Sequence, residues 1–339
     1  MGKLARALST ALILLVAVTL LPTKPTFADD EGAPFRVSQT LSVGGDGGWD
    51  YIAIDPDRKL LYLPRSSHTM VVDATNGKTV GDIPGQKQNH GVALVPSVGR
   101  GFISDGKDAT VVIFDLKTNG VLGKIKADED ADGIIFDPAS GKVLVVCGDA
   151  GVVIPIPADV DPGSGKADAP LQLGGKPEYL AADGRGKVYI DLVDKNQVAV
   201  VDTKTMQVVD KWSTSPGGNP VGLSIDPKQR RLFVGCRKPQ KLIVMSADDG
   251  KVLGDVPIGA GCDGTQFDNG YAFASCRDSS LTVARETSSG KFELVQTVKT
   301  RGGAKTLCVD PTTHSVFLPA PSPKPDPFVV LVVIPSSAR

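Results

Sequence analysis

The chain has 339 residues, of which 41% are hydrophobic and 22% are charged, a composition typical of a folded globular protein. Its 38 glycines and 25 prolines favour many short strands joined by turns, and they argue against a helical bundle or a doubly wound sheet. The 37 Lys and Arg residues are balanced by 38 Asp and Glu residues. Because there is no basic excess, we expect no nucleic-acid partner.

Residues 1–28 have the parts of a secretory signal peptide. Lys3 and Arg6 precede an apolar run, and Ala28 is a small residue suited to a cleavage site. The run is shorter than the roughly 20 residues of a membrane-spanning helix and ends at Pro22. We therefore expect cleavage after Ala28 and a periplasmic or secreted mature protein with no membrane span. Its formal charge would be −4 rather than −1, because the removed segment holds three basic residues and no acidic one.

A unit of about 40 residues recurs seven times between residues 29 and 339. In most units an apolar strand ends at an acidic turn, often Asp-Pro, and further apolar strands follow. The turn positions are Asp55, Val95, Asp137, Asp183, Asp226, Asp268 and Asp310, which lie 40 to 46 residues apart. This period predicts a single all-β domain, a seven-bladed β-propeller whose blades are four-stranded antiparallel sheets. We expect it to be a monomer.

The seventh unit is one strand short. Its third strand, 328–334, is followed by only five residues, whereas segment 34–43 has strand-like alternation and belongs to no other unit. We therefore expect this N-terminal strand to close the last blade as its outer strand, which would remove exposed sheet edges there.

The fourth unit resembles the YVTN-type (YncE-like) propeller repeat. The resemblance rests on Val188-Tyr189-Ile190 and on Asn-Gln-Val-Ala-Val-Val-Asp-Thr at 196–203, and it extends over residues 35–335. The Asn that usually ends the second strand of such a repeat is absent from all seven units. The resemblance implies a seven-bladed propeller. Because this wider family includes exported binding proteins, surface proteins, and lactonase-like and dehydrogenase-like proteins, it assigns no single chemistry.

Residues at the same phase of the repeat are expected to form a ring. Five positions before the turns lie Asp50, His90, Asp132, Glu178, Val221, Asp263 and Lys305, and six of these seven are ionisable. Because the innermost strands begin here, we expect the six to line a ligand site at one mouth of the channel. Four crowded carboxylates repel one another unless a cation neutralises them. Ca²⁺ or another divalent cation held by Asp50, Asp132, Glu178 and Asp263 is one interpretation, and a solvated ring of ion pairs is the simpler alternative.

Three arginines follow the second strands on the same predicted face. Arg65, Arg237 and Arg277 are candidate ligands for an anionic group, because the planar guanidinium suits carboxylate or phosphate. Pairing with neighbouring acids is the alternative.

Five cysteines in an exported chain leave at least one thiol unpaired. Cys262 and Cys276 should face each other across the first two strands of one blade and are the candidate disulfide, with Cys236 as a competing partner for Cys262. Cys308 lies in an apolar strand and is expected to be a buried thiol.

Two functional classes remain open, and no cofactor is certain. The leading hypothesis is a non-enzymatic exported protein that binds a small molecule or a protein partner at the ionic mouth. The alternative is a metal-dependent, lactonase-like or esterase-like hydrolase that uses the same ring, with His90 as general base. An electron-transfer dehydrogenase is disfavoured because the sequence has no CxxC or CxxCH motif.

Overall fold

The computed structural model describes Gly2 and residues 33–288, 291–323 and 325–336. The predicted signal peptide therefore lies outside the described residues, apart from Gly2. Among the described residues, the helical content is one 3₁₀ turn, Pro96–Val98, and no helix is long and apolar enough to cross a membrane.

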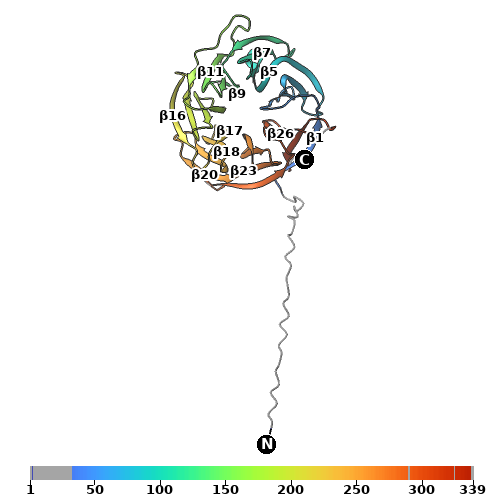
Figure 1. Ribbon diagram of the computed structural model, residues 1–339, viewed down its shortest axis with the longest axis vertical. Helices are drawn as coiled ribbons and strands as arrows, with labels where there is room; N and C mark the ends of the chain where they lie inside the picture. The colour runs from blue at the N-terminus through green and yellow to red at the C-terminus, as the bar shows by residue number, and fades with distance from the viewer. Residues whose placement is uncertain (1, 3–32, 289–290, 324, 337–339) are drawn as a thin grey trace. The chain divides into compact units, whose positions relative to one another are not determined.

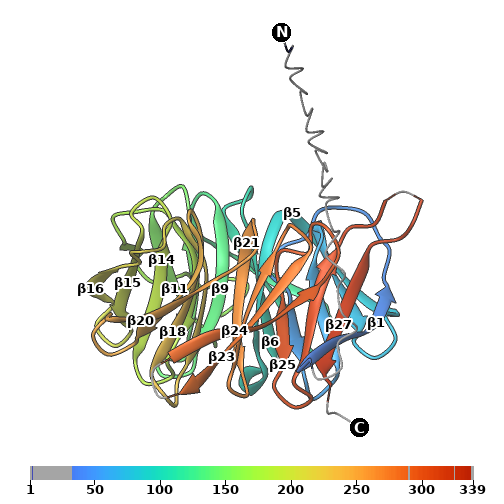
Figure 2. The same cartoon turned by 90° about the horizontal axis from the view of Figure 1, so that it is seen from below.

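The described residues from Ala33 onward form one unit, in which the β-sheets are arranged as a ring about a central axis (Figure 1 and Figure 2). Blade 1 contains β2 (Ala53–Asp55), β3 (Leu60–Pro64), β4 (Ser66–Asp73) and the first part of β5 (Thr79–Val95). Blade 2 contains the rest of β5, β6 (Arg100–Asp105), β7 (Thr110–Asp115) and β8 (Val121–Lys126). Blade 3 contains β9 (Ala131–Asp137), β10 (Lys142–Cys147), β11 (Val152–Pro157) and β12 (Leu171–Gln172).

The remaining blades follow in chain order. Blade 4 contains β13 (Pro177–Ala182), β14 (Lys187–Leu192), β15 (Gln197–Asp202) and β16 (Gln207–Ser213). Blade 5 contains β17 (Pro220–Asp226), β18 (Arg231–Arg237), β19 (Gln240–Ser246) and β20 (Val252–Pro257). Blade 6 contains β21 (Cys262–Asp268), β22 (Tyr271–Cys276), β23 (Ser280–Ser288) and β24 (Lys291–Lys299). Blade 7 contains β25 (Cys308–Asp310), β26 (Ser315–Ala320), β27 (Val329–Pro335) and β1 (Phe35–Ser42).

The acidic turns that set the repeat have a local cause. Asp226 Oδ1 accepts hydrogen bonds from the amides of Lys228 and Gln229, at 2.9 and 3.1 Å, after β17. Asp310 makes the same bonds with the two residues that follow its proline. A short carboxylate that accepts amides two and three positions ahead stabilises a tight turn, and proline at the next position fixes the backbone for it. Asp-Pro therefore ends an inner strand and starts the hairpin to the second strand.

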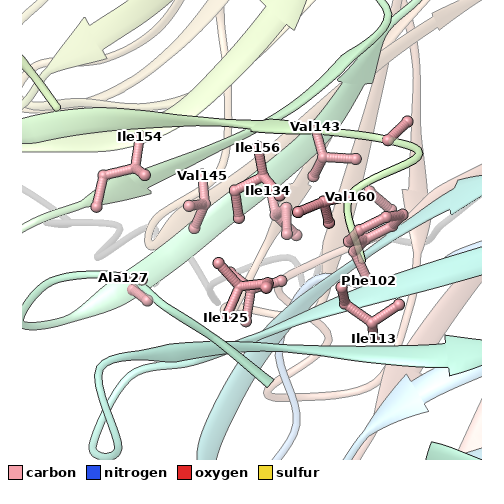
Figure 3. Packing of buried hydrophobic residues seen from close by; sticks show 14 of the residues in the cluster. Phe102, Ile113, Ile125, Ala127, Ile134, Val143, Val145, Ile154, Ile156 and Val160 are labelled. Atoms are coloured by element: carbon pink, nitrogen blue, oxygen red, sulfur yellow. The ribbon is translucent and has the colours of Figure 1, made fainter. Parts of the chain in front are cut away.

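The core lies between blades rather than inside one sheet. Within the described residues, the buried apolar side chains form seven clusters, one between each pair of neighbouring blades. Figure 3 shows the cluster between blades 2 and 3, where Phe102, Ile113 and Ile125 of one blade face Ile134, Val143 and Ile154 of the next. Both faces of each sheet are thus covered, which explains the near-continuous apolar runs in the second and third strands.

The N-terminal strand closes the last blade, as the sequence predicts. β1 pairs antiparallel with β27, from Phe35 opposite Pro335 to Ser42 opposite Val329. Its two buried side chains enter different clusters, because Phe35 packs between blades 6 and 7 and Leu41 packs between blades 7 and 1. The predicted fold, a seven-bladed propeller of four-stranded antiparallel blades, is therefore confirmed.

Candidate functional site

Four ring residues from four consecutive blades form a connected ionic chain at one mouth of the channel. His90 Nδ1 lies 2.9 Å from Asp50 Oδ2, and Lys305 Nζ lies 2.8 Å from Asp50 Oδ1. Lys305 Nζ also lies 3.0 Å from Asp263 Oδ2. Four of the seven positions that lie five residues before a turn thus converge, although they come from different blades. Burial raises the pKa of Asp50, but the hydrogen bond from His90 and the charge of Lys305 outweigh it, so the pKa lies below its usual value.

Asp132 joins this chain without being neutralised by it. Its Oδ1 lies 3.5 Å from His90 Nδ1, but that oxygen is buried and has no hydrogen-bond partner among the described residues. Burial, and then the charges of Asp50 and Glu178, raise the pKa of Asp132 well above its usual value. Asp50, His90 and Asp132 each offer one ligand atom, and these three atoms lie within 4.8 Å of one another. They form a geometrically suitable set of metal ligands.

The backbone at Glu178 binds a second buried acid, Asp191, which the sequence analysis missed. The backbone amides of Glu178 and Tyr179 donate to Asp191 Oδ1, at 3.2 and 2.7 Å. Asp191 is fully buried, and its Oδ2 has no hydrogen-bond partner within the described chain. Burial raises the pKa of Asp191 well above its usual value, and burial also raises that of Glu178. An acid inside the apolar strand Val188-Tyr-Ile-Asp-Leu was the available signal.

Arg237 and Arg277 converge on Asp263. Arg277 Nη2 lies 2.7 Å from Asp263 Oδ2, and Arg237 Nη2 contacts Asp263 Oδ1. The carboxylate, 3% exposed, therefore meets three cations when Lys305 is included. Both arginine side chains remain partly exposed, at 34% for Arg237 and 53% for Arg277. In this structure the two arginines pair with a neighbouring acid.

Arg65 has a structural role that leaves no donor for a ligand. It is 2% exposed, and four of its N–H groups donate to the carbonyl oxygens of Gly44, Gly45, Gly47 and Gly48, at 3.0 to 3.1 Å. The fifth N–H points at Met70 Sδ, at 3.9 Å, and the guanidinium lies 3.9 Å from the centre of the Phe328 ring. We therefore exclude Arg65 from the site. Its position in the repeat could not show this, because four of the donors bind the glycine-rich segment upstream and the fifth faces Met70.

Two tyrosines meet in the channel immediately after the ionic ring. The residues that follow the ring positions are Tyr51, Gly91, Gly133, Tyr179, Gly222, Gly264 and Thr306. The rings of Tyr51 and Tyr179, from blades 1 and 4, contact each other with centroids 4.5 Å apart. Gly133 is required here, since a Cβ at this position would lie 2.5 Å from the carbonyl oxygen of Glu178. Burial raises the pKa of Tyr179 to about 12.

The cysteine pair lies beside the arginine cluster. Cys262 is directly opposite Cys276 in the β21–β22 register, next to Asp263 and Arg277. All five cysteines are buried thiols in this structure. The register is compatible with the predicted disulfide, which stays a prediction.

Comparison with known proteins identifies a fold and no activity. No family model matches the chain, and no curated protein matches it. Among many similar solved chains, one is a chain of "Kuenenia stuttgartiensis Hydrazine Synthase", with a TM-score of 0.70 and 16% sequence identity. The similarity covers 80% of this chain and 92% of that chain. At this identity it supports the propeller fold alone.

Proposed function

We propose that this propeller is an exported binding protein whose ionic mouth holds a cationic ligand. The rigid ring of blades is an interaction scaffold, and export is inferred from the N-terminal sequence pattern. The single observation that carries the proposal is Asp132, a carboxylate with a buried, unpartnered oxygen 3.5 Å from His90. A buried charge without a partner is strongly destabilising, so a bound cation would stabilise this arrangement.

The balance of charges supports the same ligand class. Asp50 and Asp263 are neutralised by Lys305, Arg237 and Arg277, whereas Asp132, Glu178 and Asp191 have no ion pair with Lys or Arg among the described residues. Acids therefore exceed permanent cations at this mouth. An anionic ligand would meet this excess of carboxylates, so the arginine pair does not favour one.

A divalent metal ion is the cation that the geometry favours. Ligand atoms about 2.1 Å from one ion lie roughly 3.0 to 3.5 Å from each other. His90 Nδ1 lies 2.9 Å from Asp50 Oδ2 and 3.5 Å from Asp132 Oδ1. Mixed imidazole and carboxylate donors suit Zn²⁺ or Mn²⁺ better than Ca²⁺, which prefers oxygen. This set differs from the four carboxylates proposed from the sequence. It leaves out Asp263, which three cations already surround, and Glu178, which is not in the described set whose ligand atoms lie within 4.8 Å of one another.

Titration calorimetry with Zn²⁺, Mn²⁺ and Ca²⁺ tests the proposal. We expect saturable binding of Zn²⁺ or Mn²⁺ and a rise in melting temperature. Asp132→Asn keeps the side-chain shape but removes the charge, and it should weaken binding by about tenfold or more. Glu129→Gln is the control, because Glu129 is an exposed acid three residues away that should leave the affinity unchanged. Absence of both heat and a melting shift with all three ions would refute metal binding.

The second candidate is a metal-dependent hydrolase that acts on lactones or esters. The observation that favours it is Glu178, a half-buried carboxylate with a raised pKa near the proposed ion. A bound ion would supply an activated water, and Glu178 could accept its proton. If the carboxylates alone hold the ion, His90 is the candidate base. Turnover of a lactone and aryl-ester panel that a chelator abolishes, and that Glu178→Gln reduces with metal affinity unchanged, would favour the enzyme over the binding protein.

A further inference from the structure

The two ends of the channel differ in chemistry. The residues immediately before the seven turns, four positions beyond the ionic ring, are Ile54, Leu94, Phe136, Ala182, Ile225, Phe267 and Val309. All seven are apolar and partly exposed, although the turn residues beside them are mostly buried. In the repeat, Tyr51 and Tyr179 come one position after the ionic residues and three positions before the apolar residues, so their contact separates these two sets. The mouth at the Asp-Pro turns is therefore an apolar ring at the other end of the inner strands.

A cavity of about 400 Å³ opens within this apolar mouth. It is lined by the inner strands of four consecutive blades, β9, β13, β17 and β21, which lie on the inner side of the ring (Figure 1). Phe136, Ile225 and Phe267 form part of its wall, and Tyr179 of the tyrosine pair also contributes. Small-molecule sites usually have volumes of about 300 to 1,000 Å³, so this cavity is large enough to hold one small molecule.

The polar groups of this cavity can orient a ligand but offer it no charge. Among the described lining residues there is no Lys, Arg or His, and the one carboxylate, Asp183, is 3% exposed and bound to Arg230 at 2.7 Å. Ser224 is 6% exposed, and its hydroxyl has no hydrogen-bond partner in the described chain. The four lining strands are also the end strands of their sheets, so backbone N–H and C=O groups on their channel side have no neighbouring strand.

We infer that the apolar mouth binds a neutral, largely apolar, ring-containing small molecule with one or two hydrogen-bonding groups. The lining side chains are mostly apolar and offer no unpaired charge, so a charged ligand would find no ion-pair partner here. The volume of the cavity between the four strands suits a compact molecule. The hydroxyl of Ser224 and the amide of Gln266 are the side chains placed to position its polar groups. This site is independent of the metal site proposed at the other mouth.

Fluorescence titration with N-phenyl-1-naphthylamine, a neutral aromatic probe, tests this inference. We expect saturable binding of one probe per chain. Ala182→Trp fills the cavity from a partly exposed lining position and should weaken probe binding by about tenfold or more. Val309→Trp is the matched control, since Val309 has the same repeat phase in blade 7 but does not line the cavity. The probe affinity of Val309→Trp should stay within about threefold of the probe affinity of the unmodified chain.

The outcomes separate this inference from its competitors. Non-saturable probe binding, or equal affinity for Ala182→Trp and the unmodified chain, would overturn it. A dimer in sedimentation experiments that Ala182→Trp dissociates would also overturn it, in favour of pairing between two copies at this mouth. Asp132→Asn should leave probe affinity unchanged, so failure of the metal proposal does not affect this result. Melting temperatures of both Trp variants show whether each one is folded.

Discussion

The guanidinium of Arg65 fixes the segment that connects the closing strand to the first blade. All five of its N–H groups are used, and four of the acceptors are carbonyls of the glycine-rich segment 44–48. Burial lowers the pKa of Arg65 to about 10, so it keeps its charge at neutral pH. Because one buried, charged side chain donates hydrogen bonds to several backbone carbonyls, it determines the path of the whole loop.

Arg65→Lys should therefore destabilise the fold although it conserves the charge. An ammonium has three donors and cannot reproduce the planar fork, so at least one of the four carbonyls loses its partner. We expect a loss of roughly 1–3 kcal/mol in the free energy of unfolding, measured by urea denaturation. Arg36→Lys, at an exposed position of β1, is the control and should change little. Equal stability of both variants would show that the glycine segment does not depend on Arg65.

At the scale of contacts between elements, a second arginine connects blades 4 and 5. Arg230, in the turn before β18, places Nη1 2.7 Å from Asp183 Oδ2 and Nε 2.8 Å from Asp248 Oδ1. Its Nη2 also donates to the hydroxyl of Tyr189 and to the carbonyl of Ala247, both at 3.2 Å. Burial alone would raise the pKa of Asp183, but hydrogen bonds from Arg230 and from the amides of Lys187 and Arg185 outweigh it and lower the pKa.

This contact makes part of the stability depend on pH. Because the pKa of Asp183 is lower in the folded chain, its contribution is complete above the unfolded value of about 3.9 and is lost as pH falls through the folded pKa. Asp183→Asn should lower the free energy of unfolding by roughly 2 kcal/mol at pH 7, and this difference from the unmodified chain should shrink as pH falls below about 4. Urea denaturation of the variant and of the unmodified chain between pH 3 and pH 7 measures the difference. A difference that stays constant with pH would contradict an ionic contribution.

The sequence predicted the elements well because their signals are local. Turn spacing and β-branched runs depend on neighbouring residues, so the seven units and the closing strand could be found from the sequence alone. Contacts between elements had no such signal. The insertion after β11 packs on blade 2, where Arg100 Nη1 donates to the carbonyl of Val160 at 2.6 Å. The pairing of Tyr51 with Tyr179 likewise depends on their meeting from blades 1 and 4, which repeat phase alone cannot predict.

At the scale of the whole molecule, stability depends on completing the ring. Each of the seven apolar clusters lies between two blades, so no blade buries its apolar residues alone. β1 supplies Phe35 to one cluster and Leu41 to the next, and it covers the edge of β27. Figure 2 shows β1 beside β27 in the last blade. One short strand thus joins the two ends of the chain and completes two of the seven interfaces.

A chain that begins at Gly47 should consequently lose cooperative unfolding. Without β1, two apolar clusters open and β27 becomes an exposed edge, which also favours aggregation. We expect a broad transition at a lower temperature, followed by circular dichroism and tryptophan fluorescence. A chain that begins at Ala33 is the control, because it keeps β1. Leu41→Ala is the milder variant, and it should remain folded but lose roughly 3 kcal/mol. An unchanged transition in the Gly47 chain would mean that six complete blades and three strands are sufficient for the fold.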